Sequence, residues 1–169
     1  MIRERERAPD FSLPGTETRT HRLSEHTDTG PVVLVFSPFH ATADASTHVH
    51  GAEWLTLYPG VDVLGITAWS RDRIDRFVDD HGVTFPLLSD PTGDVAERYG
   101  VDDVETRGAA SPSHSIVVID TERTVQYAWC ADGVEETPDI GELYRVIHGQ
   151  RAERSRGGSR SREVVRRDA

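Results

Sequence analysis

Three mainly apolar runs stand out along the chain, at residues 32–36, 61–66 and 115–119, the first of them continuous. Each run is short and rich in β-branched side chains, which is typical of a strand covered on both faces of a sheet. A further strand is expected at 124–130, where the polar turn at 120–123 would join it to the third run as a hairpin. The pattern therefore predicts a buried central sheet.

Shorter extended pieces and helices fill the intervals between these strands. Turn signals at Pro14-Gly15 predict a small hairpin, and the spacing of Ile74, Phe77 and Val78 behind Ser70 predicts a helix that Ser70 caps and that His81-Gly82 ends. The other expected elements are the hairpin strands at 11–13 and 20–23, an extended piece at 85–88, and helices at 43–58, 94–99 and 139–148, the last with Ile140, Leu143, Val146 and Ile147 on its apolar face.

This order of elements predicts an α/β fold of the thioredoxin-like class, in which helices flank a central mixed β-sheet. The chain has 169 residues, which suits one compact domain. We place that domain at residues 1–149. Residues 150–169 show no periodic apolar face and are expected to form a disordered, arginine-rich tail.

Charge is unevenly distributed. The chain has 29 acidic residues and 19 basic ones, all arginine, and residues 1–149 carry a net charge of −14 against +4 for residues 150–169. A lysine-free acidic surface suits a salt-adapted (halophilic) cytoplasm, with GC-rich codon bias as the alternative explanation. An acidic body binds nucleic acid poorly, so only the tail could make weak contacts with nucleic acid or acidic partners; a solvated terminus is the alternative.

The sequence also limits location and cofactors. No apolar stretch reaches the ~18 residues of a membrane span, and the N-terminus lacks the apolar core of a secretory signal, so we expect a soluble, cytoplasmic protein without membrane contact. Cys130 is the only cysteine, which excludes an intrachain disulfide and a cysteine-based metal cluster. No cofactor is expected.

Several motifs occur in an order that resembles the peroxiredoxins, and more narrowly their alkyl hydroperoxide reductase / thiol-specific antioxidant branch. The resemblance covers roughly residues 7–149. It implies a thioredoxin-like fold and a thiol-dependent peroxide-reducing ancestry. The motifs are APDF at 8–11, VVLVFSPF at 32–39, FPLLSD at 85–90, YGV at 99–101 and IVVID at 116–120.

The resemblance also shows where this chain departs from the family. Pro38 and Thr42 match the motif that precedes the peroxidatic cysteine, but Ala45 stands at the cysteine position itself. The family's thiolate-stabilising arginine corresponds, by spacing back from the IVVID strand, to His114. Peroxide reduction requires a thiolate with a lowered pKa, which a methyl group cannot supply. We therefore expect conventional peroxidase activity to be lost, leaving a binding or dimerisation scaffold that pairs with itself or with an active family member.

Two alternatives remain open at the level of sequence. Cys130 could support thiol oxidoreductase activity, although a small structural residue is the simpler interpretation, because Val125, Tyr127 and Trp129 are expected to face the core and Cys130 the other side. Histidines and one carboxylate near the inherited site could bind a metal, against the simpler interpretation of polar residues filling an unused pocket. These candidate ligands are His40, Asp44, His48 and His114.

Overall fold

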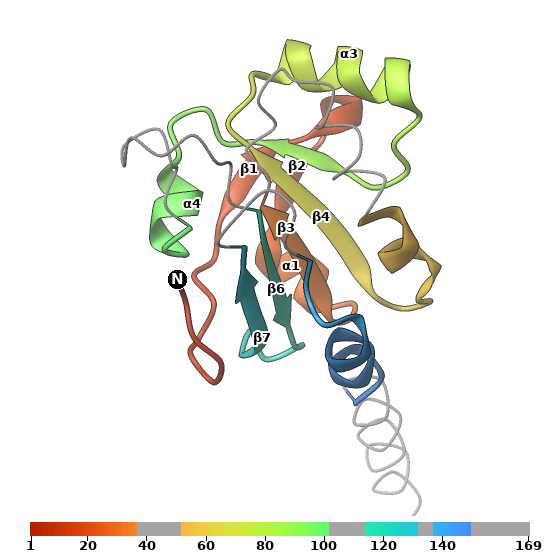
Figure 1. The fold of residues 1–169 in the computed structure, drawn as a ribbon. Helices are drawn as coiled ribbons and strands as arrows, with labels where there is room; N and C mark the ends of the chain where they lie inside the picture. The colour runs from red at the N-terminus through yellow and green to blue at the C-terminus, as the bar shows by residue number, and fades with distance from the viewer. Residues whose placement is uncertain (37–51, 102–113, 132–136, 150–169) are drawn as a thin grey trace, which may run out of the picture.

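A computed structural model of the chain describes residues 1–36, 52–101, 114–131 and 137–149. A mixed sheet with strand order β5-β4-β3-β6-β7 lies at its centre, and helices cover both faces (Figure 1). A separate two-stranded sheet, β1-β2, lies at one side. The strands are β1 (Ser12–Pro14), β2 (Thr20–Arg22), β3 (Val32–Phe36), β4 (Asp62–Thr67), β5 (Leu87–Ser89), β6 (Ser115–Ile119) and β7 (Val125–Cys130).

The middle strand, β3, runs parallel to β4 and antiparallel to β6. All five of its residues are buried, as expected for an apolar run covered on both faces. The three long apolar runs of the sequence thus form the three central strands of the sheet. The predicted hairpin of β6 and β7 is also confirmed.

The N-terminal hairpin differs from its prediction in its connection and in its end. β1 and β2 pair antiparallel, but the short 3-10 helix η1 (Thr16–Thr18) joins them in place of a tight turn. Leu23 does not belong to the second strand, because it begins the short helix α1 (Leu23–Thr27). Gly15 bridges to Leu88 of β5, so the hairpin covers the outer edge of that strand.

Helix α3 (Arg71–His81) follows its prediction closely. Ile74 and Phe77 are buried, and Gly82 ends the helix with φ of 65°, a left-handed conformation that glycine adopts without strain. Ser70 occupies the N-cap position but makes no side-chain capping bond, so the predicted cap is positional only. The other helical elements are η2 (Trp54–Leu57) and α4 (Asp94–Arg98). η2 falls within the range 43–58 predicted as a helix, of which residues 43–51 lie outside the described residues.

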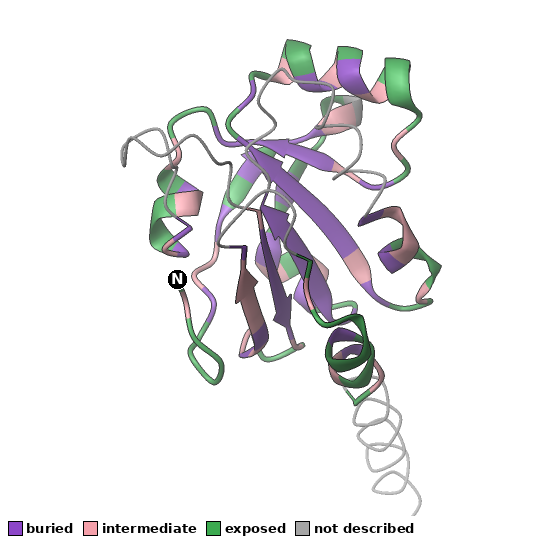
Figure 2. Cartoon of the chain, viewed as in Figure 1, coloured by how far each residue is buried: buried purple, intermediate pink, exposed green. Residues whose placement is uncertain are grey.

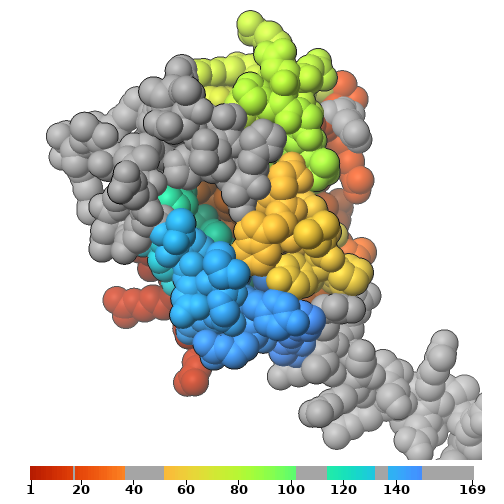
Figure 3. Space-filling model, turned by 45° about the vertical axis from the view of Figure 1, so that its right-hand side comes forward, coloured from red at the N-terminus to blue at the C-terminus, as the bar shows by residue number. Residues whose placement is uncertain are grey.

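The last described helix spans residues 140–149. Leu143 and Ile147 are fully buried in it, but Ile140 is 48% exposed and does not join the core as predicted. Residues 52–60 lie beside this helix on the surface (Figure 3). The contact is aromatic, because the Tyr58 ring packs edge-on against Tyr144 and His148 at centroid distances of 5.8 and 5.7 Å.

The two faces of the sheet are buried under different elements (Figure 2). One core cluster joins the sheet to α3, η2 and the helix at 140–149. The other joins it to the N-terminal segment, β1, α1 and α4. None of the helices among the described residues is long and apolar enough to cross a membrane.

Asp10 links several segments around the second core cluster. Its carboxylate accepts the backbone N–H of Ser24 at 3.0 Å and pairs with Arg22 at 3.1 Å and Arg123 at 3.4 Å. Burial raises the pKa of this carboxyl, but the Ser24 and Arg22 hydrogen bonds and the Arg123 charge outweigh it, and the pKa lies below its ordinary value. The ionised form therefore stabilises the fold.

We expect Asp10→Asn to lower the free energy of unfolding by about 1–2 kcal/mol at pH 7. A depressed folded-state pKa contributes stability that is complete above the unfolded value, near 3.8, and is lost as the pH falls through the folded value. Urea unfolding of both proteins at pH 7 and pH 3 tests this. A mutational cost that stays constant over this range would contradict the assignment.

Candidate functional site

The inherited site, as the sequence places it, lies around the end of β3. Phe36 closes that strand, and residues 37–51 follow it directly. That segment falls outside the described residues, so the predicted positions in it remain predictions. They are Pro38, His40, Thr42, Asp44, Ala45 and His48.

His114 is described, and it stands immediately before β6. Its carbonyl accepts the Ala131 N–H at 2.9 Å, and its ring packs against Trp129 with centroids 5.1 Å apart. The ring nitrogen Nδ1 is shielded from solvent. Because β3 and β6 are antiparallel, His114 lies at the end of the sheet where β3 leads into residues 37–51.

The register of the sheet places three residues side by side at this same end. Phe36 of β3 pairs with Ser115 of β6, and Ser115 pairs with Cys130 of β7. Directly paired residues of antiparallel strands point to the same face, with Cβ atoms about 4.5–5.5 Å apart. Phe36, Ser115 and Cys130 therefore form one row, the strand-end row, on the face of the sheet opposite to the Trp129 side chain that the His114 ring contacts.

Ser115 is the residue of this row that sequence analysis did not single out. It is fully buried, and its hydroxyl has no hydrogen-bond partner within the part of the chain that the structure describes. A buried hydroxyl without a partner costs about 1–3 kcal/mol, so such groups merit a functional explanation. The available sequence signal is weak: one polar residue at the start of the apolar run 115–119.

Cys130 lies on β7 and is partly exposed, and its sulfur is 3.8 Å from the Ala131 carbonyl. The prediction that Val125 and Tyr127 share the opposite face is wrong. The pairing of β6 with β7 is irregular between Val118 and Ile119, where β7 has one extra residue, as in a β-bulge. The alternation of faces is therefore reversed there, so Val125 packs into one core cluster and Tyr127 into the other. Cys130 still lies on the face opposite to Tyr127 and Trp129, as predicted.

Tyr99, which directly follows α4, packs against Phe36 of the strand-end row. The Tyr99 ring packs 5.3 Å from the Phe36 ring, and its hydroxyl donates to the Pro9 carbonyl at 2.8 Å. Burial raises the pKa of the Tyr99 phenol, so this hydroxyl stays protonated and remains a donor. Asp90, 3% exposed, accepts the Val95 and Ala96 N–H groups at 3.0 Å each and thereby fixes the start of α4.

The predicted metal site is described at only one of its four ligands, His114. Within the described ranges, no three histidine, cysteine, aspartate or glutamate side chains are grouped so as to hold a metal ion. The histidine cluster thus stays a prediction that concerns residues 37–51.

Comparison with known proteins gives the family. The model of the AhpC/TSA family matches residues 5–128. The selenocysteine-containing peroxiredoxin PrxU of Peptoclostridium acidaminophilum is 34% identical over 128 residues, which cover 64% of this chain and 61% of PrxU. Peroxiredoxin Bcp of Escherichia coli K12 is 34% identical over 98 residues, covering 56% of this chain and 62% of Bcp. The alignments therefore span about three fifths of these relatives.

Solved structures agree on the fold. The crystal structure of peroxidoxin BcpB from Mycobacterium tuberculosis superposes with a TM-score of 0.71 at 26% identity, covering 90% of this chain and 98% of that one. A yeast mitochondrial 1-Cys peroxiredoxin superposes with a TM-score of 0.74 at 19% identity. These neighbours confirm the mixed α/β sheet of the thioredoxin-like class. Together with the match over residues 5–128, they show that this chain belongs to the AhpC/TSA family of peroxiredoxin-like proteins.

Proposed function

We propose that this chain is a peroxiredoxin-family protein that has lost conventional peroxide reduction and acts as a binding or dimerisation scaffold. The observation that carries the proposal is the position of its only thiol. Cys130 lies on β7, two strands away from β3, whereas the family's nucleophile follows the β3 strand, where this chain has Ala45. Since peroxide reduction begins with thiolate attack, a methyl group at position 45 cannot start the reaction.

His114 supports the same proposal. It stands where the resemblance places an arginine that stabilises the thiolate, and its ring packs against Trp129. Imidazole can be neutral near pH 7, whereas arginine is always charged. Loss of both the nucleophile and the permanent cation favours a natural departure from peroxidase chemistry over a single replacement. Partners for the scaffold are a second copy of the chain or an active family member.

A second candidate function is thiol oxidoreductase activity, in which Cys130 of the strand-end row reduces peroxide. Cys130 is paired with the buried Ser115, so the chain's thiol lies at the end of the sheet where β3 leads into residues 37–51. In this reaction the Cys130 thiolate attacks one peroxide oxygen, the O–O bond breaks, and the products are a sulfenic acid and water. A partner thiol then displaces water to give a mixed disulfide, which a second thiol reduces.

Peroxide consumption decides between these candidates. We expect the purified, metal-free chain with dithiothreitol to consume hydrogen peroxide no faster than its Cys130→Ser variant, and intact-mass spectrometry to find Cys130 unmodified after equimolar peroxide. Rapid consumption that disappears in Cys130→Ser would establish the thiol route and overturn the scaffold proposal. Rapid consumption that survives in Cys130→Ser would contradict both candidates.

A further inference from the structure

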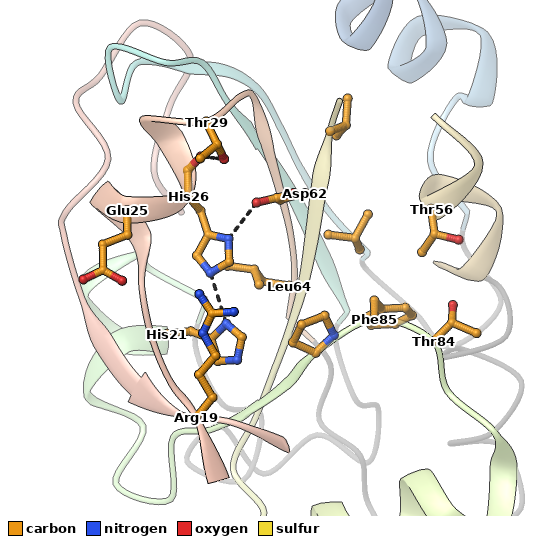
Figure 4. Close-up of a pocket in the computed structure, with 13 residues that line it drawn as sticks. Arg19, His21, Glu25, His26, Thr29, Thr56, Asp62, Leu64, Thr84 and Phe85 are labelled. Atoms are coloured by element: carbon orange, nitrogen blue, oxygen red, sulfur yellow. Dashed lines mark hydrogen bonds and ion pairs between the residues drawn. The ribbon is translucent and has the colours of Figure 1, made fainter. Parts of the chain in front are cut away.

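A cavity lies at the opposite end of the sheet from His114. Its volume is about 390 Å³, within the range of small-molecule sites. Residues of β2 and α1 form one wall, the first residues of β4 lie behind, and Thr84 and Phe85 stand on the other side (Figure 4). It shares no residue with the strand-end row.

The cavity exposes part of a sheet edge. β5 pairs with β4 only from Gly65 to Thr67, so the first residues of β4 have no strand partner on that side. The Gly65 N–H donates to the Pro86 carbonyl, whereas the Asp62 N–H donates to Pro31 on the other side. Because amides alternate along a strand, the N–H and carbonyl of Val63 point toward the cavity.

A chain of hydrogen bonds crosses the wall of the cavity. Asp62 Oδ2 lies 2.7 Å from His26 Nδ1, and His26 Nε2 lies 3.1 Å from His21 Nδ1. The carboxylate requires a proton on His26 Nδ1, so Nε2 of a neutral His26 accepts from His21 Nδ1–H. The bond from His26 outweighs desolvation and lowers the pKa of Asp62, so this carboxylate is ionised at neutral pH.

This arrangement can store one proton. The His21–His26 pair can gain a proton while both hydrogen bonds persist, but a second proton would set two N–H groups against each other across 3.1 Å. The other charged residues that line the cavity are Arg19, before β2, and Glu25, on α1; residues 84–86 contribute none. The Glu25 side chain points away from the His26–Asp62 pair (Figure 4).

The Arg19 guanidinium is the side chain of the cavity best suited to hold an anion. The Arg19 side chain is exposed and reaches toward the two histidines (Figure 4); its charge helps to lower the pKa of Asp62, but among the described residues it makes no side-chain hydrogen bond or close ion pair. Asp62 already accepts from His26, and the Thr56 hydroxyl donates to Glu53. The planar guanidinium fork of Arg19 favours a planar anion such as a carboxylate.

The remaining lining is apolar, with Leu64, Phe85 and Pro86 facing the same space. We propose that this cavity binds a small monocarboxylate with an apolar body, its carboxylate paired with Arg19 and its body against Phe85 and Pro86. The bound anion favours the protonated state of the nearby histidine pair, so binding takes up a proton.

Benzoate is the probe that tests the site. Titrated into the full-length protein at low salt and followed by amide NMR shifts, it should bind saturably and perturb residues 19–29, 62–64 and 84–86. Arg19→Gln should weaken binding at least about tenfold, the usual effect of losing a charge-assisted hydrogen bond. Arg3→Gln removes the same charge from the exposed N-terminal segment and should leave the affinity unchanged.

Neutral benzamide and inorganic sulfate separate the carboxylate site from its alternatives. Both should bind at least tenfold more weakly than benzoate. Equal binding of benzamide, equal competition by sulfate, no saturable binding of benzoate, or an Arg19→Gln variant with unchanged affinity would each overturn the proposal.

The proton uptake has its own readout. Benzoate should bind more tightly at pH 6 than at pH 8, and calorimetry in buffers of different ionisation enthalpy should show proton uptake by the wild-type protein. Replacing both histidines, His21→Gln with His26→Gln, should remove the pH dependence while Arg19 still binds the anion, because either ring alone could still take up the proton. If that variant does not fold, the two-buffer measurement on wild-type protein decides. Binding without proton uptake would refute the coupling.

Discussion

Replacing Ala45 with cysteine and His114 with arginine, in a Cys130→Ser background, is expected to create thiol-dependent peroxide reduction in a chain that otherwise lacks it. The new thiolate would attack one peroxide oxygen and release water, and the arginine would stabilise both the thiolate and the developing negative charge. The measurement is the second-order rate constant for hydrogen peroxide from stopped-flow mixing. We expect the double replacement to react roughly 10²-fold faster than Ala45→Cys alone.

The size of this effect follows from thiolate chemistry. A thiol with an ordinary pKa near 8.5 is about 3% ionised at pH 7, and lowering the pKa to about 6 raises that fraction roughly thirtyfold. A hydrogen bond from arginine to the departing oxygen supplies the rest. Trp129 offers a surface for the new guanidinium, because its ring already packs against position 114 and arginine stacks well on tryptophan.

A matched control is available one residue along the chain. Ser46→Cys in the same Cys130→Ser, His114→Arg background introduces an equally new thiol outside the position that the family motif selects. It should react at the slow rate of an unactivated thiol. If it reacts as fast as the Ala45→Cys protein, the motif has been placed one residue away from its true position, and the interpretation of His114 has to be revised as well.

The sheet was predictable from sequence because its signals are local. Residues 32–36 and 115–119 form strands with the predicted bounds, and β4 is shifted by one residue from 61–66. A buried strand is marked by its own run of apolar side chains, whatever it pairs with. Helix α1 was missed because its five residues show no helical periodicity, whereas α4, of the same length, was predicted with Gly100 as its end.

The arrangement of the candidate sites needed the structure. The strand-end row depends on the pairing of Phe36 with Ser115, two residues far apart in the sequence, and no local pattern reports register. The face of Val125 was mispredicted because one irregularity reverses the alternation along a strand. The chain from His21 through His26 to Asp62 likewise joins three elements, of which the sequence had placed only two.

Asp90, shortly before α4, is the single polar residue whose replacement we expect to lower the free energy of unfolding most. Asp90→Ala should lower the free energy of unfolding by about 2–3 kcal/mol, because it leaves the Val95 and Ala96 N–H groups at the start of α4 without their acceptor in a buried position. Asp94→Ala removes an exposed acid from the same helix and should cost no more than about 1 kcal/mol, the usual contribution of a first-turn charge. Urea unfolding followed by circular dichroism measures both. Equal costs would mean that the charge near this helix start matters and the buried acceptor does not.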